Sequence, residues 1–257
     1  MPWNPDVYHK FLSERMEPFD DLVRLINVSE GMRVIDLGCG TGELTSRLAD
    51  LLPRSHVVGI DSSDEMLSRA KSLARSGLTF ERQAIEDASG EYDLVFSHAA
   101  IQWVDDHEKL IPLLLSLVRP GGQLAVQLPS NHDHPSHVNI RELSREEPFQ
   151  SAFSGCSRTS RVLSIGRYAE LLHLSGAVNL NVFEKLYPHV LNNSDEIVSW
   201  MSGTALIPYL ERLPNNLHDE FLSRLHMRFN KLWPGVPVFF GFQRMLIYAV
   251  RSVVKTS

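Results

Sequence analysis

Short apolar runs alternate with amphipathic stretches along the first half of the chain. The runs have the length and composition of buried strands, and most are followed by apolar side chains at helical spacing. The predicted strands are residues 33–37, 56–61, 78–80, 92–97 and 123–128. Strands alternating with helices in this way predict a parallel, doubly wound α/β sheet.

The pattern changes after Pro129. A polar loop leads into a predicted helix, an irregular serine- and glycine-rich stretch follows, and later segments alternate between helical and strand spacing. The predicted elements are a helix over 136–145, an irregular connection over 148–165, a helix over 168–174, a strand over 180–187, helices between 194 and 229, and a strand over 239–250 that Gly241 interrupts.

We therefore expect a Rossmann-like, mostly parallel, seven-stranded sheet with a helical lid over the strand ends. The expected divisions are a cofactor-binding core with an N-terminal flap at 1–128, lid insertions at 129–165 and 191–236, and the remaining strands at 176–190 and 237–257. The N-terminal segment is either a helix covering the sheet's edge or a flap that brings Tyr8 or Arg15 near a cofactor.

A glycine-rich turn follows the first predicted strand. Asp36 precedes Gly38, Gly40 and Gly42 in a D-x-G-x-G-x-G pattern, and a helix start follows directly. Glycines allow a ligand close to the backbone, and the free N–H groups of a helix start face it. Asp61 ends the second strand about 20 residues further on, where this architecture binds ribose hydroxyls.

The glycine spacing distinguishes two classes of ligand. Dinucleotide-binding folds use G-x-G-x-x-G, because the pyrophosphate needs the third glycine one position later. The spacing here is G-x-G-x-G, which resembles the first motif of class I S-adenosylmethionine (SAM) methyltransferases. An acid beside the loop suits the ammonium group of SAM.

Composition narrows the partners and the compartment. The 257 residues are 43% hydrophobic and 22% charged, and the net charge of −6 argues against nucleic acid or an anionic membrane as partner. A small acidic substrate needs only a local cluster of cations. Cys39 and Cys156 show no metal-ligand spacing and predict free thiols, and neither a signal peptide nor a membrane-spanning run is present, so we expect a cytoplasmic protein.

Several further motifs resemble one family, the bacterial trans-aconitate methyltransferases. The resemblance covers nearly the whole chain. It includes Trp3-Asn4-Pro5-x-x-Tyr8-x-x-Phe11-x-x-Glu14-Arg15, Gly59-Ile60-Asp61-Ser62-Ser63, Ile101-Gln102-Trp103, Ala125-Val126-Gln127, Pro135-Ser136-His137-Val138-x-x-Arg141-Glu142, Trp200, Gly203-Thr204-Ala205-Leu206, Pro208 and Arg244. It implies a SAM-dependent O-methyltransferase that forms a methyl ester on a carboxylate of a small polyacid.

Three positions depart from that family's pattern. Ala84 stands where members place an acid toward the adenine amine, His98 replaces an asparagine, and Ile207 replaces an arginine. Gln83 or Glu86 are the alternative adenine contacts. Because arginine is the natural bidentate partner of a carboxylate, the resemblance implies carboxyl methylation more strongly than it identifies the acid.

The chemistry defines the kind of site to expect. A carboxylate with a pKa near ~4 is already ionised at neutral pH, so methyl transfer needs alignment and exclusion of water but no general base. The pocket candidates are Gln102 and Trp103, and the substrate candidates are His137, Tyr187, Trp200, Tyr209 and Arg244. The cofactor candidates are Asp36, Gly38, Gly40, Gly42, Asp61, Ser62, Met66, Ala84, Ile85, Ser97, Tyr8 and Arg15.

Other interpretations remain open from sequence alone. The His132–His137 loop invites a metal site, but a polar loop without metal is the simpler interpretation. A malonyl-carrier methyltransferase of biotin synthesis shares the glycine loop and a similar Gln-Trp segment, and a SAM-binding module without catalysis needs the same loop. A dehydrogenase fits the glycine spacing least well. The oligomeric state is not predicted.

Overall fold

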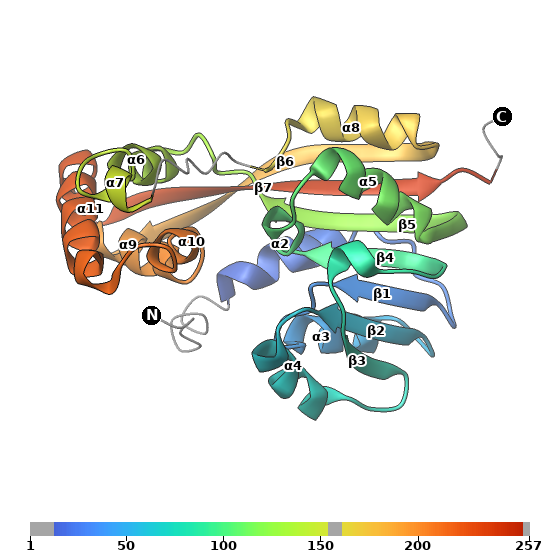
Figure 1. Cartoon of the computed structure of the whole chain (residues 1–257). Helices are drawn as coiled ribbons and strands as arrows, with labels where there is room; N and C mark the ends of the chain where they lie inside the picture. The colour runs from blue at the N-terminus through green and yellow to red at the C-terminus, as the bar shows by residue number, and fades with distance from the viewer. Residues whose placement is uncertain (1–12, 154–160, 254–257) are drawn as a thin grey trace. The chain divides into compact units, whose positions relative to one another are not determined.

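The structure is a computed structural model that describes residues 13–153 and 161–253 (Figure 1). The described residues form two compact units. The sheet unit comprises residues 17–129, 161–185 and 244–253, and the helical unit comprises residues 13–16, 130–153 and 186–243. Each unit is described by itself below.

The strands form one seven-stranded sheet in the order β3-β2-β1-β4-β5-β7-β6. The strands are β1 (Arg33–Leu37), β2 (His56–Asp61), β3 (Leu78–Arg82), β4 (Tyr92–His98), β5 (Val118–Pro129), β6 (Ala177–Leu191) and β7 (Val238–Arg251). The first five pair in parallel, and β7 is antiparallel to β5. The predicted fold class is confirmed. Strand order reverses between β1 and β4, the position at which such sheets bind ligands.

The helices also follow the predicted order (Figure 1). They are α2 (Ser13–Val23), α3 (Glu43–Leu51), α4 (Asp64–Ala70), α5 (His107–Ser116), α6 (Pro135–Leu143), α7 (Phe149–Ala152), α8 (Ile165–Leu174), α9 (Asp195–Ser202), α10 (Ile207–Leu210) and α11 (His218–Leu232), with short 3-10 turns η1 (Lys71–Leu73), η2 (Ile85–Asp87), η3 (Ile101–Trp103) and η4 (Asn215–Leu217). Among the described residues, no helix combines the length and apolar character that crossing a membrane requires.

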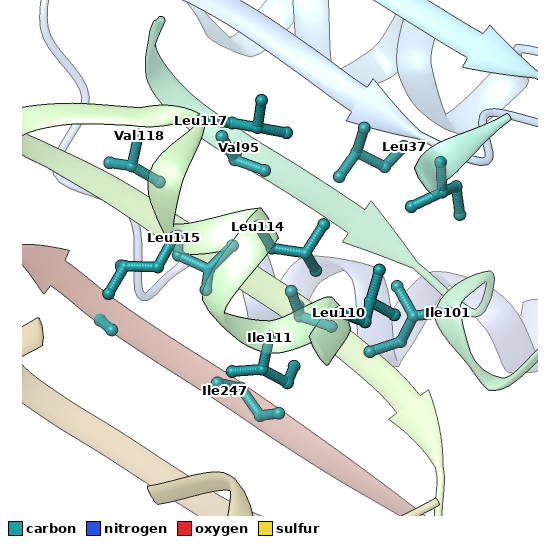
Figure 2. Close-up of a cluster of buried hydrophobic side chains, with 14 of the residues drawn as sticks. Leu37, Val95, Ile101, Leu110, Ile111, Leu114, Leu115, Leu117, Val118 and Ile247 are labelled. Atoms are coloured by element: carbon teal, nitrogen blue, oxygen red, sulfur yellow. The ribbon is translucent and has the colours of Figure 1, made fainter. Parts of the chain in front are cut away.

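The sheet buries a separate apolar layer on each face. On one face, Leu110, Ile111 and Leu114 of α5 pack against strand residues such as Val95 and Ile247 (Figure 2). The other face packs Phe19 and Leu22 of α2 with residues of α3 and α4. Strand side chains alternate between these layers, since successive residues of a strand point to opposite faces. Odd and even positions of β4, β5 and β7 can therefore be assigned to a face.

The helical unit has an aromatic core of its own. Phe149 of α7 meets Phe221 of α11 edge to face, with ring centroids 4.9 Å apart, and Phe229 meets Trp233 at 5.3 Å. Trp200 of α9 is buried in the same cluster. Aromatic pairs in this geometry contribute about 1 kcal/mol each beyond their buried area.

Several predicted boundaries were wrong, each for a local reason. The Ser62-x-x-Glu65 capping pattern predicts a helix start at Ser62, but α4 is capped by Ser63, whose hydroxyl accepts from the Met66 N–H. Strand β7 continues through Gly241, whose missing side chain leaves room for Leu186: a Cβ at Gly241 would lie 2.8 Å from Leu186 Cδ1. Strand β5 begins at Val118, before the predicted start at residue 123, and residues 119–122 interrupt its register with β4.

Three more elements differ from the prediction because of packing between residues distant in the sequence. Strand β6 begins earlier and ends later than predicted, at Ala177 and Leu191. The stretch expected to be irregular contains α7, which closes on the aromatic core through Phe149. The helical region after Ser194 divides into α9, α10 and α11. The alternation of apolar and polar residues locates elements, but their ends depend on partners distant in sequence.

A series of buried hydrogen bonds joins η3 to the helices α5 and α8. His107 Nε2 donates to the Ile101 carbonyl at 2.9 Å, which leaves Nδ1 to accept from the Tyr168 hydroxyl. The same hydroxyl accepts from the Leu163 N–H at 3.2 Å. Burial lowers the pKa of His107, so the imidazole stays neutral in this role.

We predict that Tyr168→Phe lowers Tm by about 4 °C, because it leaves His107 Nδ1 and the Leu163 N–H buried without their partner. The measurement is thermal unfolding followed by circular dichroism. Tyr92→Phe is the matched control, since its partly exposed hydroxyl donates only to the Ser89 carbonyl, at 3.1 Å. Equal Tm values for the two variants would show that these buried hydrogen bonds contribute nothing to stability.

Candidate functional site

The three glycines after β1 have positive φ angles of 77°, 56° and 83° at Gly38, Gly40 and Gly42. Packing explains two of them. A Cβ at Gly38 would lie 2.3 Å from Ala100 Cβ, and one at Gly42 would lie 2.9 Å from Ala70 Cβ. A Cβ at Gly40 would meet nothing within 4 Å among the described residues. The outer glycines therefore let the loop pack, and the middle one leaves the backbone open to a ligand.

Asp61 joins the loop to the end of β2. Its Oδ2 accepts from the Gly40 N–H and its Oδ1 from the Ser63 N–H, both at 2.9 Å. Each carboxylate oxygen retains a further acceptor position, and the side chain is half-exposed. A fixed carboxylate at this place in the sheet suits the two ribose hydroxyls of an adenosine.

Asp36 is nearly enclosed at the end of β1, with 3% of its surface exposed. The Thr45 hydroxyl donates to its Oδ2 at 2.6 Å. Burial raises the pKa of Asp36 to about 7, with a smaller contribution from the charge of Asp61. Because this pKa is near neutrality, the carboxyl group would ionise readily beside a cation such as the ammonium of SAM. Sequence reasoning missed Thr45, because no local pattern marks a hydroxyl nine residues beyond the acid.

The other cofactor candidates have more varied surroundings. Ser97 is fully buried and donates to the Leu37 carbonyl at 2.8 Å, so its hydroxyl joins β4 to β1. Ala84 caps η2, and Ile85 packs in the sheet's core. Met66 is half-buried on α4, and Ser62 is exposed. Gln83, the alternative adenine contact, donates instead to the Asp87 carbonyl at 2.7 Å.

Two candidates from the N-terminal segment cannot be placed. Tyr8 lies outside the described residues. Arg15 lies in α2, but its side chain is likewise outside the described part of the structure.

The Gln-Trp segment forms η3 after β4. The Gln102 Nε2 donates to the Ala99 carbonyl at 2.7 Å, and its Oε1 is buried without a partner among the described residues. Trp103 is 42% exposed, so it is not part of the core. Arg161 donates to the Trp103 carbonyl at 2.6 Å. The segment is therefore held through the Gln102 amide nitrogen and the Trp103 carbonyl, while the Gln102 Oε1 has no partner among the described residues.

Arg244 is the substrate candidate that belongs to the sheet unit. It opposes Pro129 at the start of the β5–β7 pairing and is 5% exposed. The other substrate candidates, His137, Tyr187, Trp200 and Tyr209, belong to the helical unit.

Those four residues have distinct environments. The His137 Nδ1 lies 3.2 Å from the Ser136 hydroxyl, and burial lowers the pKa of His137 to about 3, so the ring is neutral. Tyr187 and Trp200 are buried, and Tyr209 packs its ring against Phe221. No group of three or more metal-ligating side chains occurs among residues 13–153 and 161–253.

Comparison with known proteins gives consistent results. Residues 28–170 match a family model described as a methyltransferase domain. The chain is 42% identical over 257 residues to a trans-aconitate 2-methyltransferase of Deinococcus radiodurans, covering 98% of this chain and 99% of that protein. It is 36% identical over 260 residues to one of Variovorax paradoxus, with 98% and 99% covered.

Solved structures support the fold. The YcgJ protein from Bacillus subtilis superposes with a TM-score of 0.62 at 14% identity, covering 92% of this chain and 99% of that one. Phosphoethanolamine N-methyltransferase 2 of Haemonchus contortus, in complex with SAM, gives a TM-score of 0.55 at 18% identity, covering 92% of this chain and 52% of that one.

We predict opposite outcomes for two glycine substitutions in the loop. Gly40→Ala costs only its left-handed φ, about 1 kcal/mol, yet places a methyl group on the open side of the loop, so SAM affinity falls at least about tenfold. Gly38→Ala collides with Ala100 and lowers Tm by about 8 °C. Calorimetric titration with SAM and thermal unfolding measure the two effects. SAM affinity unchanged in Gly40→Ala would contradict a ligand on that side.

The Asp36 carboxyl group predicts a pH dependence. Its folded pKa lies above the ordinary value of 3.8, so the ligand-free protein loses stability as the pH rises from about 4 through about 7. The ionised form pairs with an ammonium, so SAM affinity increases between about pH 5.5 and about pH 7.5.

Asp36→Asn is expected to weaken SAM binding about tenfold at neutral pH and to remove this pH dependence. The measurement is the SAM dissociation constant across the pH range for both proteins. A wild-type affinity that stays flat over that range would refute the assignment of Asp36.

Proposed function

We propose that this chain, which belongs to the family of trans-aconitate 2-methyltransferases, forms a methyl ester on a carboxylate of trans-aconitate or a closely similar small polyacid. It is a SAM-dependent methyltransferase. The observation that carries the finer proposal is the pairing of an open glycine loop, held by Asp61 and flanked by Asp36, with a buried arginine on the same sheet.

Each part of this site has a role in an in-line transfer between a cation and an anion. Bound SAM supplies a methyl group on a positively charged sulfur. Asp61 accepts the ribose hydroxyls and Asp36 faces the ammonium, so the donor is fixed at both ends. Arg244 binds the acid and neutralises its charge, while Trp103 shields the transfer from water. No residue acts as a general base, because the attacking oxygen is already ionised.

The identity of the acid depends on cations other than Arg244. Ile207 begins α10 at a position where the resemblance to the family implies an arginine, so this chain offers one guanidinium fewer than that pattern. A tricarboxylate gains most from several arginines, since each bidentate pair adds a charge-assisted contact. We therefore propose that this chain discriminates less sharply between tricarboxylates and dicarboxylates than an enzyme with arginine at this position.

The malonyl-carrier alternative has no observation in its favour. It requires a basic docking face for an acidic carrier protein, whereas the chain carries a net charge of −6. The two relatives compared above match this chain over nearly their full lengths, and both are trans-aconitate 2-methyltransferases.

The test is transfer of a labelled methyl group from SAM to a panel of di- and tricarboxylates, followed by mild base. We expect a base-labile labelled product with trans-aconitate. Arg244→Met should raise KM for the acid about 100-fold with little change in SAM affinity, because one charge-assisted contact is lost.

Arg251→Met is the matched control on β7. Its guanidinium donates to the Ser116 and Val118 carbonyls and to no other group of the described residues, so KM for the acid should stay at the wild-type value. A base-stable product would exclude an ester, and an unchanged KM in Arg244→Met would exclude this arginine from acid binding.

A further inference from the structure

Gln127 lies on the face of the sheet that α2 covers. It opposes His98 of β4 and Leu246 of β7 in the strand register. Its neighbours Val126 and Leu128 point into the opposite layer with α5, whereas Leu246 belongs to the layer with α2. The Phe19 ring of α2 contacts the His98 ring on this face, with centroids 5.9 Å apart.

Four polar side chains, one from each of four adjacent strands, form a row across this face. Asp36 opposes Phe96, which shares a face with His98; Gln127 opposes His98; and Arg244 opposes Pro129, two residues beyond Gln127. The row therefore runs from β1 through β4 and β5 to β7. An acid stands at one end and a cation at the other, which matches a cationic donor beside an anionic acceptor. Gln127 is the neutral hydrogen-bonding group next to Arg244 in this row.

The amide of Gln127 is fully buried and unsatisfied. Its residue is 0% exposed, and neither Nε2 nor Oε1 has a hydrogen-bond partner among the described residues. Buried amides are almost always paired, and leaving one unpaired is unfavourable. Of these two unpaired atoms, the Nε2 donor is the more unusual, because buried N–H groups are left unpaired less often than buried carbonyl oxygens.

Gln123 shows what this sheet does with a structural glutamine. It lies four residues earlier on β5, on the same face, and is also buried. Its Oε1 accepts from the Asn27 N–H at 2.7 Å and from the Tyr248 hydroxyl at 3.0 Å, and its Nε2 donates to the Asn27 carbonyl at 2.9 Å. Both polar atoms of Gln123 are therefore paired, whereas neither polar atom of Gln127 has a partner among the described residues.

We propose that Gln127 is a substrate-binding residue whose Nε2 donates to a carboxylate oxygen of the acid held by Arg244. This inference rests on the proposed carboxyl methylation. Arg244 supplies the positive charge that binds the acid. Gln127 orients the acid, because a hydrogen bond from an amide N–H is directional and fixes which carboxylate oxygen points toward the methyl donor. A buried position suits this role, because the transfer requires water to be excluded around both charges.

The experiment compares Gln127→Met with Gln123→Met, two changes of equal shape on one strand. For Gln127→Met we expect Tm without ligand to stay equal or rise, since two unpaired buried atoms are removed. KM for trans-aconitate should rise at least about tenfold, the value of one hydrogen bond to a charged group, with the affinity for S-adenosylhomocysteine unchanged.

For Gln123→Met we expect the reverse. Tm should fall by about 5 °C, because Asn27 and Tyr248 lose their partner, and KM for the acid should stay at the wild-type value. A structural role for Gln127 predicts instead that both variants lose Tm and keep KM, so the two glutamines separate the explanations.

The outcomes also separate this inference from the function on which it rests. If wild-type protein methylates an acid and Gln127→Met keeps its KM, Gln127 does not bind substrate and the proposed function stands. If wild-type protein neither methylates any acid of the panel nor gains Tm from one in the presence of S-adenosylhomocysteine, both are overturned. A fall in Tm for Gln127→Met with unchanged KM would assign the residue to packing.

Discussion

The site depends on the bonds that join the end of β1 to the end of β2. The Asp61 carboxylate accepts the Gly40 N–H, and the Gly38 N–H donates to the Ile60 carbonyl at 2.8 Å. A three-glycine loop has high conformational entropy when free, and these bonds hold it in one shape. The carboxylate that we propose binds the donor's ribose is thus also the group that orders the loop. Binding and folding of this corner are inseparable.

The order of strands and helices along the chain was predictable, because it follows from the spacing of apolar and polar residues. The alternation of apolar runs and helical spacing placed β1, β2 and the helices between strands, and the glycine spacing with Asp61 identified the type of ligand. These features are local in sequence. The antiparallel pairing of β7 with β5 and the division of the region after Ser194 into separate helices are set by packing between distant segments, which periodicity does not contain.

The chemistry of individual side chains was predictable only in part. The acid at Asp36 was evident, but its raised pKa arises from burial, which outweighs the opposing hydrogen bond from Thr45, and both come only with the folded chain. Ser97 lies near the carboxyl end of β4, where ligand-binding residues are expected, and its hydroxyl donates to the Leu37 carbonyl of the neighbouring strand. Gln123 and Gln127 are indistinguishable as sequence, and their different surroundings appear only once β5 lies beside β4 and β7.

The contact between Gly38 and Ala100 has a consequence for how such enzymes diversify. Since a Cβ at position 38 would lie 2.3 Å from the methyl group of Ala100, any side chain at position 38 is excluded while the loop keeps its shape. Ala100 directly precedes η3, the turn that contains Gln102 and Trp103. The glycine loop and the start of η3 therefore cannot change shape independently, and substitutions that spare the loop are easier beside this contact than at it.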